Sequence, residues 1–270
     1  MSSYRGDIRA HGFSLTELAV TLLIASLLFG GLLPSFKAQL QLVRMRDTDR
    51  ALQEIVDALV SHAIAHGQLP CPADPAGGTG KALIAAGTTQ ACELLRGTIA
   101  SGAIPFAELG LPSADVWGNK YSYWVDASWT GPGQVRCASV RIPPPSFCAE
   151  ASASSLEVHT RLDTGAPTSR VATEVVAVVV AHGRNGRHGW SARGAKLPDN
   201  PGRNPDEGFN DLTRAVTPTP VVLLAREPSA GATVCDDAAP GGARCDFDHQ
   251  LVFLSKNLML ARLVAARSLP

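Results

Sequence analysis

The chain is poor in aromatic and charged side chains, and its charges cancel. Aromatic residues make up 6% and charged residues 18% of the 270 positions, with 24 basic and 24 acidic side chains. A net charge of zero argues against a protein that binds nucleic acid over its whole surface, although a local basic patch stays open. No two cysteines have C-x-x-C spacing, which excludes zinc-ribbon and thioredoxin-type sites.

The sequence also lacks the dense groups of polar residues by which many enzymes are identified. His182 and His188 lie in a glycine-rich loop after an apolar stretch, but no Ser-His-Asp signature or H-E-x-x-H accompanies them. The segment 77–82 is not a phosphate-binding loop, because Pro75 occupies the first glycine position and Ala82 replaces the magnesium-binding Ser or Thr. We therefore expect a protein that is not an enzyme and needs no cofactor. A membrane-anchored enzyme that uses His182 is the alternative.

One hydrophobic run near the amino terminus has the length of a membrane span. Residues 13–33 are almost all apolar, and a helix of this length covers ~30 Å at ~1.5 Å per residue. A carboxylate inside such a span costs roughly 2.5 kcal/mol or more, so the acid of this run, Glu17, needs a partner. A cleaved secretory signal fits less well, because its apolar region is about 7–15 residues long and ends at a small-residue site. An ordinary signal anchor explains the length but not Glu17.

A short hydrophilic leader, Gly12, Phe13, a Ser-Leu-Thr spacer and Glu17 follow one another in fixed order at the start of this run. These residues resemble the cleavage and methylation site of type IV prepilins and of type II secretion pseudopilins. Pro34, shortly after the run, stands where many pilins carry a helix-kinking proline. The resemblance covers only this part of the chain, yet it accounts for both the long apolar run and its carboxylate.

The resemblance implies how the chain is processed and with what it assembles. A prepilin peptidase would cut between Gly12 and Phe13, and the new amino terminus on Phe13 would be methylated. In the fibre, Glu17 of one subunit would pair with the amino terminus of its neighbour, and Pro34 would allow local unwinding during packing. The implied partners are other pilins or pseudopilins, the prepilin peptidase, the inner-membrane assembly platform and membrane lipid.

The implied function is that of a structural minor subunit of a type IV pilus or type II secretion pseudopilus, since the chain beyond the run is larger than a compact major-subunit head. The implied localisation is the inner membrane, as a single-pass protein with a periplasmic head, and the pilus or pseudopilus after assembly. Arg5 and Arg9 against Asp7 also favour a cytoplasmic amino end. The alternative function is a pilus-tip adhesin or a DNA-uptake receptor that binds through loops of the head.

The expected fold class is α+β, with a long N-terminal helix packed on an antiparallel β-sheet head and a short C-terminal helix. The long helix would have a membrane half and an amphipathic half. Apolar residues at helical spacing from Leu52 to Ile64 predict the stripe that packs on the sheet, and Gly67 and Pro70 end the helix. The expected parts are a cytoplasmic leader peptide 1–12, a transmembrane and assembly helix 13–33, its amphipathic continuation 34–66 and a globular head 67–270.

Alternation and apolar runs predict the strands of the head. Tyr121, Tyr123 and Val125 alternate as a strand, and with Asp115-x-Trp117-Gly118 before them they are similar to the segment that opens the sheet of secretion pseudopilins. The apolar run 175–181 predicts a strand in the sheet centre with both faces covered. Other strands are expected at 135–142, 156–161, 174–181, 220–224 and 250–254, and the C-terminal helix at 255–267.

Six cysteines lie beyond the apolar run, and an even number in an oxidising compartment favours disulfides. Each sequence-local pair would close a loop rich in Gly, Pro or Ala that has little apolar surface to hold it. The alternative is free, buried thiols. The predicted pairs are Cys71 with Cys92, Cys137 with Cys148, and Cys235 with Cys245.

Two loops of the head are candidate ligand sites. Asp236, Asp237, Asp246 and Asp248 flank the last cysteine pair, and oxygen-rich loops can bind calcium; some pseudopilins do so, although a solvated acidic loop is the simpler interpretation. Basic residues in the tract 182–203 could hold DNA phosphates, with Trp190 available for stacking on bases. These basic residues are Arg184, Arg187, Arg193, Lys196 and Arg203, and the acids Asp199, Asp206 and Glu207 lie among or after them.

Overall fold

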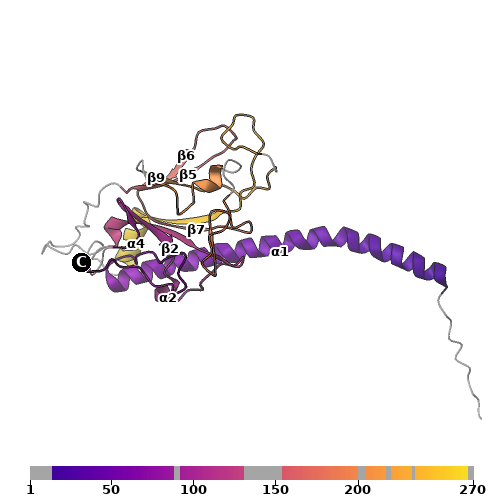
Figure 1. Ribbon diagram of the computed structural model, residues 1–270, viewed down its shortest axis with the longest axis horizontal. Coiled ribbons are helices and arrows are strands. Elements are labelled where there is room, and N and C mark those ends of the chain that lie inside the picture. Colours follow the sequence, from indigo (N-terminus) through magenta and orange to yellow (C-terminus); the bar gives the residue numbers. More distant parts are fainter. Residues whose placement is uncertain are drawn as a thin grey trace, which may run out of the picture. The chain divides into compact units, whose positions relative to one another are not determined.

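The computed structural model describes residues 14–87, 92–130, 154–199, 205–216, 220–232 and 235–266 (Figure 1). Within the first helix, the side chains of residues 27–38 are outside this description. The chain divides into two compact units, Met1–Arg46 and Asp47–Pro270, and we call the second the folded unit. The leader 1–12 and the predicted strand 135–142 lie outside the described residues.

The first element, α1 (Leu15–His66), contains both the hydrophobic run and the amphipathic stretch that follows it. Its side chains are described in two stretches, 15–26 and 39–66. The residues from Asp47 onward belong to the folded unit, so this unit includes the second half of the helix. In the folded unit the buried positions of α1 are those of the predicted stripe, including Leu52, Leu59 and Ala63.

The predicted membrane half of α1, and with it the inner-membrane single-pass localisation, is wrong. Among the described residues, no helix combines the length and the apolar character that a membrane span requires. The stretch 39–66 carries Arg44, Arg46 and other charges along its length, unlike a membrane span.

The centre of the folded unit is an antiparallel five-stranded sheet in the order β1-β2-β4-β7-β10. In β7, Val179 opposes Tyr123 of β4 on one side, and Val178 opposes Phe253 of β10 on the other. Every residue of β7 is buried, which confirms the prediction of an interior strand covered on both faces. The strands are β1 (Leu95–Arg96), β2 (Ile99–Ala103), β4 (Ser122–Asp126), β7 (Val175–Ala181) and β10 (Gln250–Ser255).

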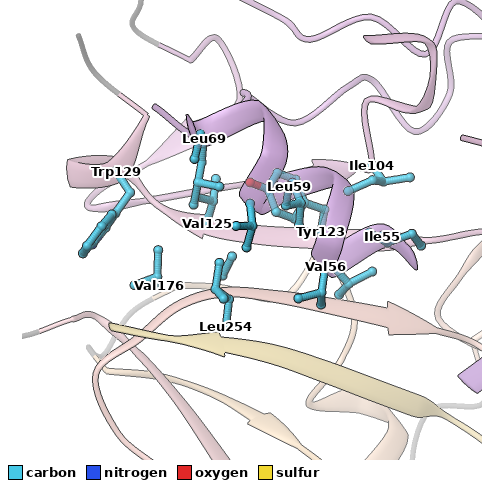
Figure 2. Close-up of a cluster of buried hydrophobic side chains, with 14 of the residues drawn as sticks. Ile55, Val56, Leu59, Leu69, Ile104, Tyr123, Val125, Trp129, Val176 and Leu254 are labelled. Atoms are coloured by element: carbon cyan, nitrogen blue, oxygen red, sulfur yellow. The ribbon is translucent and has the colours of Figure 1, made fainter. Parts of the chain in front are cut away.

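Alternation along β4 divides its side chains between two hydrophobic cores, one on each face of this sheet. Tyr123 and Val125 belong to the core that includes the apolar stripe of α1, while Trp124 belongs to the other core. Figure 2 shows Ile55, Val56 and Leu59 of α1 in one cluster with Tyr123 and Val125. A C-terminal helix, α4 (Lys256–Ala265), adds two further buried side chains to the α1 core, which confirms the helix predicted there.

A second, three-stranded sheet covers the opposite face in the order β6-β5-β9. Its strands are β5 (Leu156–Thr160), β6 (Ser169–Ala172) and β9 (Val221–Leu224). Leu156 and Leu223 pack in the same core as Trp124. Figure 1 shows this small sheet on one side of the five-stranded sheet and the end of α1 on the other.

The second sheet also corrects the expected fold class. β5 pairs antiparallel with β6 but parallel with β9, with Leu156 opposite Val221. The head is therefore not a purely antiparallel sheet, and the expected class is wrong both here and in its membrane half. The chain is a mixed α/β protein in which α1 and α4 cover one face of a sheet and a smaller mixed sheet covers the other.

Several short elements complete the fold. The short pair β3 (Asn119–Lys120) and β8 (Trp190–Ser191) joins the start of β4 to the loop that follows β7. The short helices are α2 (Phe106–Leu109), η1 (Ala127–Trp129) and α3 (Pro205–Gly208). The β3–β8 pair, α3 and β9 bring polar residues from distant parts of the chain to the end of β7.

Candidate functional site

The start of α1 carries Glu17, the predicted assembly residue. Its Oε2 accepts hydrogen bonds from the backbone N–H of Ser14 at 3.0 Å and from Ser14 Oγ at 3.1 Å. In return, the backbone N–H of Glu17 donates to Ser14 Oγ at 3.2 Å. This reciprocal pair is a capping box, which satisfies amide groups that the first helical turn leaves without partners. Glu17 therefore has a local role in starting the helix.

Most of the rest of this stretch is apolar, and its large apolar side chains are exposed on all sides. Apolar side chains that are exposed by half or more point in every direction around the helix. The stretch therefore has no separate polar face that could be turned to water while an apolar face packs on a core. The exposed apolar side chains are Leu15, Leu18, Val20, Leu22, Leu23 and Ile24, from 50% to 87% exposed. Contiguous exposed apolar surface of this kind marks an interaction site. The predicted cleavage residues Gly12 and Phe13, and the side chain of Pro34, lie outside the described residues.

Two buried histidines meet at the end of β7 and form what we call the histidine cluster. His182 Nδ1 and His249 Nε2 each lie 3.1 Å from the backbone carbonyl oxygen of Arg187. A carbonyl only accepts, so both nitrogens carry protons and the other nitrogen of each ring is an acceptor. Ser122 Oγ therefore donates to His182 Nε2 at 2.6 Å, and Asn210 Nδ2 donates to His249 Nδ1 at 3.2 Å.

This serine–histidine pair cannot act as a hydrolytic dyad as it stands. Ser122 is 1% and His182 is 0% exposed, so no substrate reaches them from solvent in this arrangement. Burial lowers the pKa of His182 to about 4 and that of His249 well below its usual value. Both rings are neutral at physiological pH, and their contacts join the ends of β4, β7 and β10.

Next to the histidines lies a second buried group, Glu207 with Asp248 and Asn185. Glu207 Oε1 accepts from Asn185 Nδ2 at 3.0 Å and from the backbone N–H of Asp248 at 3.3 Å. Burial raises the pKa of Glu207 to about 7 and that of Asp248 to about 6. With His249 these two carboxylates have ligand atoms within 4.8 Å of one another, a spacing compatible with a metal ion. Both nitrogens of His249 already bind Asn210 and Arg187, so the imidazole is not available without a rearrangement.

His188 belongs to a separate group with Asp199, Asp211 and Lys196. His188 Nδ1 lies 3.3 Å from a carboxylate oxygen of each aspartate, and Lys196 Nζ lies 2.8 Å from Asp199 and 3.5 Å from Asp211. Burial alone would raise the pKa of Asp211, but hydrogen bonds from His188 and Thr213 outweigh it and lower the pKa. The ammonium of Lys196 supplies the positive charge that a metal ion would otherwise bring. The structure therefore brings His182 and His188 into different groups.

The four aspartates predicted as a possible calcium loop do not converge on one point. Asp236 accepts from the backbone N–H of Ala238, as in a turn, and Asp237 pairs with Arg226 at 2.9 Å. Asp248 instead accepts from the backbone N–H of Asn185. The candidate metal group that contains Asp248 does not include Asp236, Asp237 or Asp246.

Arg226 is the centre of a buried ion network that the sequence did not reveal. Its Nη1 lies 2.8 Å from Asp206 and 2.9 Å from Asp237, both fully buried. Arg161 Nε binds the other oxygen of Asp206 at 2.9 Å. Arg226 Nη2 donates to the carbonyl of Cys245, so the network also ties down the last disulfide loop.

The basic tract 182–203 is less available to a polyanion than its composition indicates. Arg187 lies 3.9 Å from Glu207, and Lys196 is paired with two aspartates. Arg184 and Arg193 are exposed, while Arg203 lies outside the described residues. Trp190 is half-buried in the core beneath the second sheet.

Two of the predicted disulfides are confirmed. Cys71 is bonded to Cys92 and Cys235 to Cys245, and the described cysteines include no free thiol. The third predicted pair, Cys137 with Cys148, lies outside the described residues.

Sequence patterns missed several of the polar residues that converge here. Asp206, Glu207, Asn210 and His249 are each buried, although they come from polar segments typical of solvated loops. Single polar residues far apart in sequence give no spacing signal. The one available clue was alternation, since His249 follows the buried Cys245 and Phe247 at a period of two and therefore points away from solvent.

Comparison with known proteins gives no relative: no protein-family model, no curated protein and no solved structure matches the chain. Inference about function therefore rests on the residues themselves.

Proposed function

We propose that this protein is a structural minor subunit of a fibre of the type IV pilus or type II secretion pseudopilus class. The observation that carries the proposal is the exposed apolar surface around residues 15–26 of α1, which begins at Ser14 and Glu17. Burial of such surface between subunits stabilises assembly by roughly 25 cal/mol per Å². The order Gly12, Phe13 and Glu17 supports a peptidase-processed start to this packing helix.

In this proposal Glu17 has two successive roles. The capping box with Ser14 occupies Oε2, and among the described residues Oε1 has no hydrogen-bond partner. The freed and methylated amine of Phe13 on a neighbouring subunit pairs with the carboxylate. Because burying one charge without the other is expensive, the pair favours one axial register between helices.

The folded unit agrees with a structural role. The histidine cluster is buried and neutral, and two cations of the basic tract are held in internal ion pairs. These contacts favour a stable, disulfide-bonded head over a catalytic centre or an extended DNA-binding surface. Disulfides also fit a chain that folds in an oxidising compartment.

The proposal is tested in cells that produce the protein, by mass spectrometry of its amino terminus and by its recovery in sheared or purified fibres. We expect a methylated Phe13 start and recovery in the fibre fraction. An intact Met1 start, or a start downstream of residue 33, would contradict the proposal.

Variants separate the two roles of Glu17. Glu17→Gln keeps the capping box but removes the charge, whereas Ser14→Ala removes the box and keeps the charge. We expect Glu17→Gln and Glu17→Val to reduce recovery in fibres at least about tenfold, as loss of about 1.4 kcal/mol at each contact implies, and Ser14→Ala to have a smaller effect. Glu54→Gln, at an exposed position of the same helix, is the control. Normal recovery of Glu17→Gln would limit Glu17 to helix capping.

A further inference from the structure

The last turn of α1 carries two histidines, His62 and His66, four residues apart on one helical face. Their rings are stacked, with centroids 4.1 Å apart and an angle of 24° between the planes. Histidines at this spacing are the ones by which a single helix chelates a metal, because positions i and i+4 lie one above the other. His66 is exposed and His62 is half-buried, so the pair is accessible from solvent.

Backbone carbonyls fix the tautomer of both rings. His62 Nδ1 lies 3.1 Å from the carbonyl oxygen of Gln68, and His66 Nδ1 lies 3.1 Å from the carbonyl oxygen of His62. Each Nδ1 must therefore donate its proton, which leaves a lone pair on each Nε2. In the described chain no hydrogen bond to either Nε2 is formed. Metal-binding histidines are typically held in this way, with one ring nitrogen donating to a carbonyl or carboxylate and the other facing the metal.

The end of the helix favours a cation. The pair lies at the carboxyl end of α1, where the last carbonyl groups give the helix a partial negative charge. Burial lowers the pKa of His62, so its ring is neutral at physiological pH, which is the form that a metal ion binds; the charge of Glu108 of α2 acts against this shift. Gly67, with φ of 74°, ends the helix directly after the pair and donates to the carbonyl of Ala63.

We propose that His62 and His66 form a bidentate site for a divalent transition metal of the zinc, copper or nickel type, completed by water. Imidazole nitrogen suits these ions, whereas calcium and magnesium prefer oxygen ligands. The site is distinct from the two carboxylate groups around His188 and His249, and it does not depend on the fibre-subunit proposal. A bound ion joins two successive turns of α1 and stabilises the end of the helix against fraying.

The test is zinc titration of the untagged full-length protein by calorimetry at neutral pH, together with thermal unfolding with and without zinc. We expect one ion per chain with micromolar or tighter affinity, and an unfolding temperature that rises with zinc concentration. His66→Gln, at an exposed position, and His62→Gln should each lower the affinity more than about tenfold and abolish the zinc-dependent rise. Electron paramagnetic resonance of the copper-loaded protein should show two nitrogen ligands in the unmodified chain and one in each variant.

Two control variants make the result specific. His159→Gln removes an imidazole from β5, and His188→Gln removes the one that lies between Asp199 and Asp211. Both should bind zinc as the unmodified protein does. Absence of zinc binding in the unmodified chain, unchanged binding in His66→Gln, or loss of binding in His188→Gln would each overturn the proposal. His66→Gln keeps the test valid should His62→Gln fail to fold.

Discussion

Arg226 and Asp206 form an ion pair inside the folded unit, with Nη1 and Oδ2 2.8 Å apart and the carboxylate fully buried. Asp237 lies on the same nitrogen at 2.9 Å. Removing one partner of a buried pair leaves an uncompensated charge, which costs far more than the pair itself contributes.

We expect Arg226→Met to lower the free energy of unfolding by about 3–5 kcal/mol, because Asp206 and Asp237 would both stay buried beside one remaining cation, Arg161. Urea denaturation followed by circular dichroism measures the change. Arg193→Met, at an exposed position, is the control and should change stability by less than about 0.5 kcal/mol. A loss below about 1 kcal/mol in Arg226→Met would mean that water reaches the network.

The two disulfides should differ in their contribution because they close loops of different length. The bonded cysteines are 21 residues apart in Cys71–Cys92 and 10 apart in Cys235–Cys245. In the chain-entropy description each contributes about 2–4 kcal/mol, the longer loop more. To check which disulfide contributes more, each pair is replaced with alanines and the midpoints of urea denaturation are compared. The comparison holds when the free energy of unfolding depends equally on urea concentration in both variants. The reverse order would show that loop length does not decide the effect.

Stability should depend on pH through Glu207. Burial raises its pKa from the usual 4.5 to about 7, so the folded state holds the proton more tightly than the unfolded chain. The stability that this proton contributes is complete below about pH 4.5 and is lost as the pH rises through about 7. Glu207→Gln mimics the protonated form and removes this dependence, a difference of roughly 3 kcal/mol.

The free energies of unfolding of the unmodified protein and of Glu207→Gln are measured by denaturation at pH 5 and at pH 8, and the two proteins are compared at each pH. The unmodified protein should lose stability relative to Glu207→Gln between these two conditions, since the amide of the variant keeps an acceptor oxygen for Asn185 and does not titrate. Glu54→Gln is the exposed control and should give no difference. A parallel pH dependence of the unmodified protein and Glu207→Gln would assign the effect to Asp115 or Asp248, whose pKa values burial also raises.

Gly194 should be intolerant of any side chain. It has φ of 83°, and a Cβ would lie 2.2 Å from the backbone oxygen of Ala76. Gly110 has a similar φ of 67° but nothing within 4 Å of its Cβ position. We expect Gly110→Ala to cost about 1–2 kcal/mol for the left-handed backbone, and Gly194→Ala to cost at least about 1–3 kcal/mol more for the clash. Thermal unfolding compares them, and equal losses would show that the 74–77 loop moves aside.

Elements with a strong local signal could be predicted from the sequence. The continuous apolar run 175–181 predicted β7, and the helical spacing from Leu52 to Ile64 predicted the buried stripe of α1. Alternation at Tyr121, Tyr123 and Val125 likewise predicted β4. Sequence-local pairing of cysteines was correct for the two pairs that the structure describes. In each case a single stretch of chain contains the determining residues.

Features that depend on distant segments could not be predicted. β2 consists of Ile-Ala-Ser-Gly-Ala, which has no clear alternation, and it becomes a strand because β4 lies beside it. The burial of Glu207 beside Asn185 and Asp248 depends on where three loops meet. The expected membrane half of α1 was also not borne out, because among the described residues no helix is both long and apolar enough to span a membrane.

The parallel pairing of β5 with β9 has a kinetic consequence. The chain between them, roughly sixty residues, includes β6, β7 and the long polar loop, so its closure costs entropy before the pair is stabilised. Contacts between such remote segments slow folding, whereas the neighbouring strands β5 and β6 can meet early. We expect the small sheet to be completed late, when β9 docks beside β5.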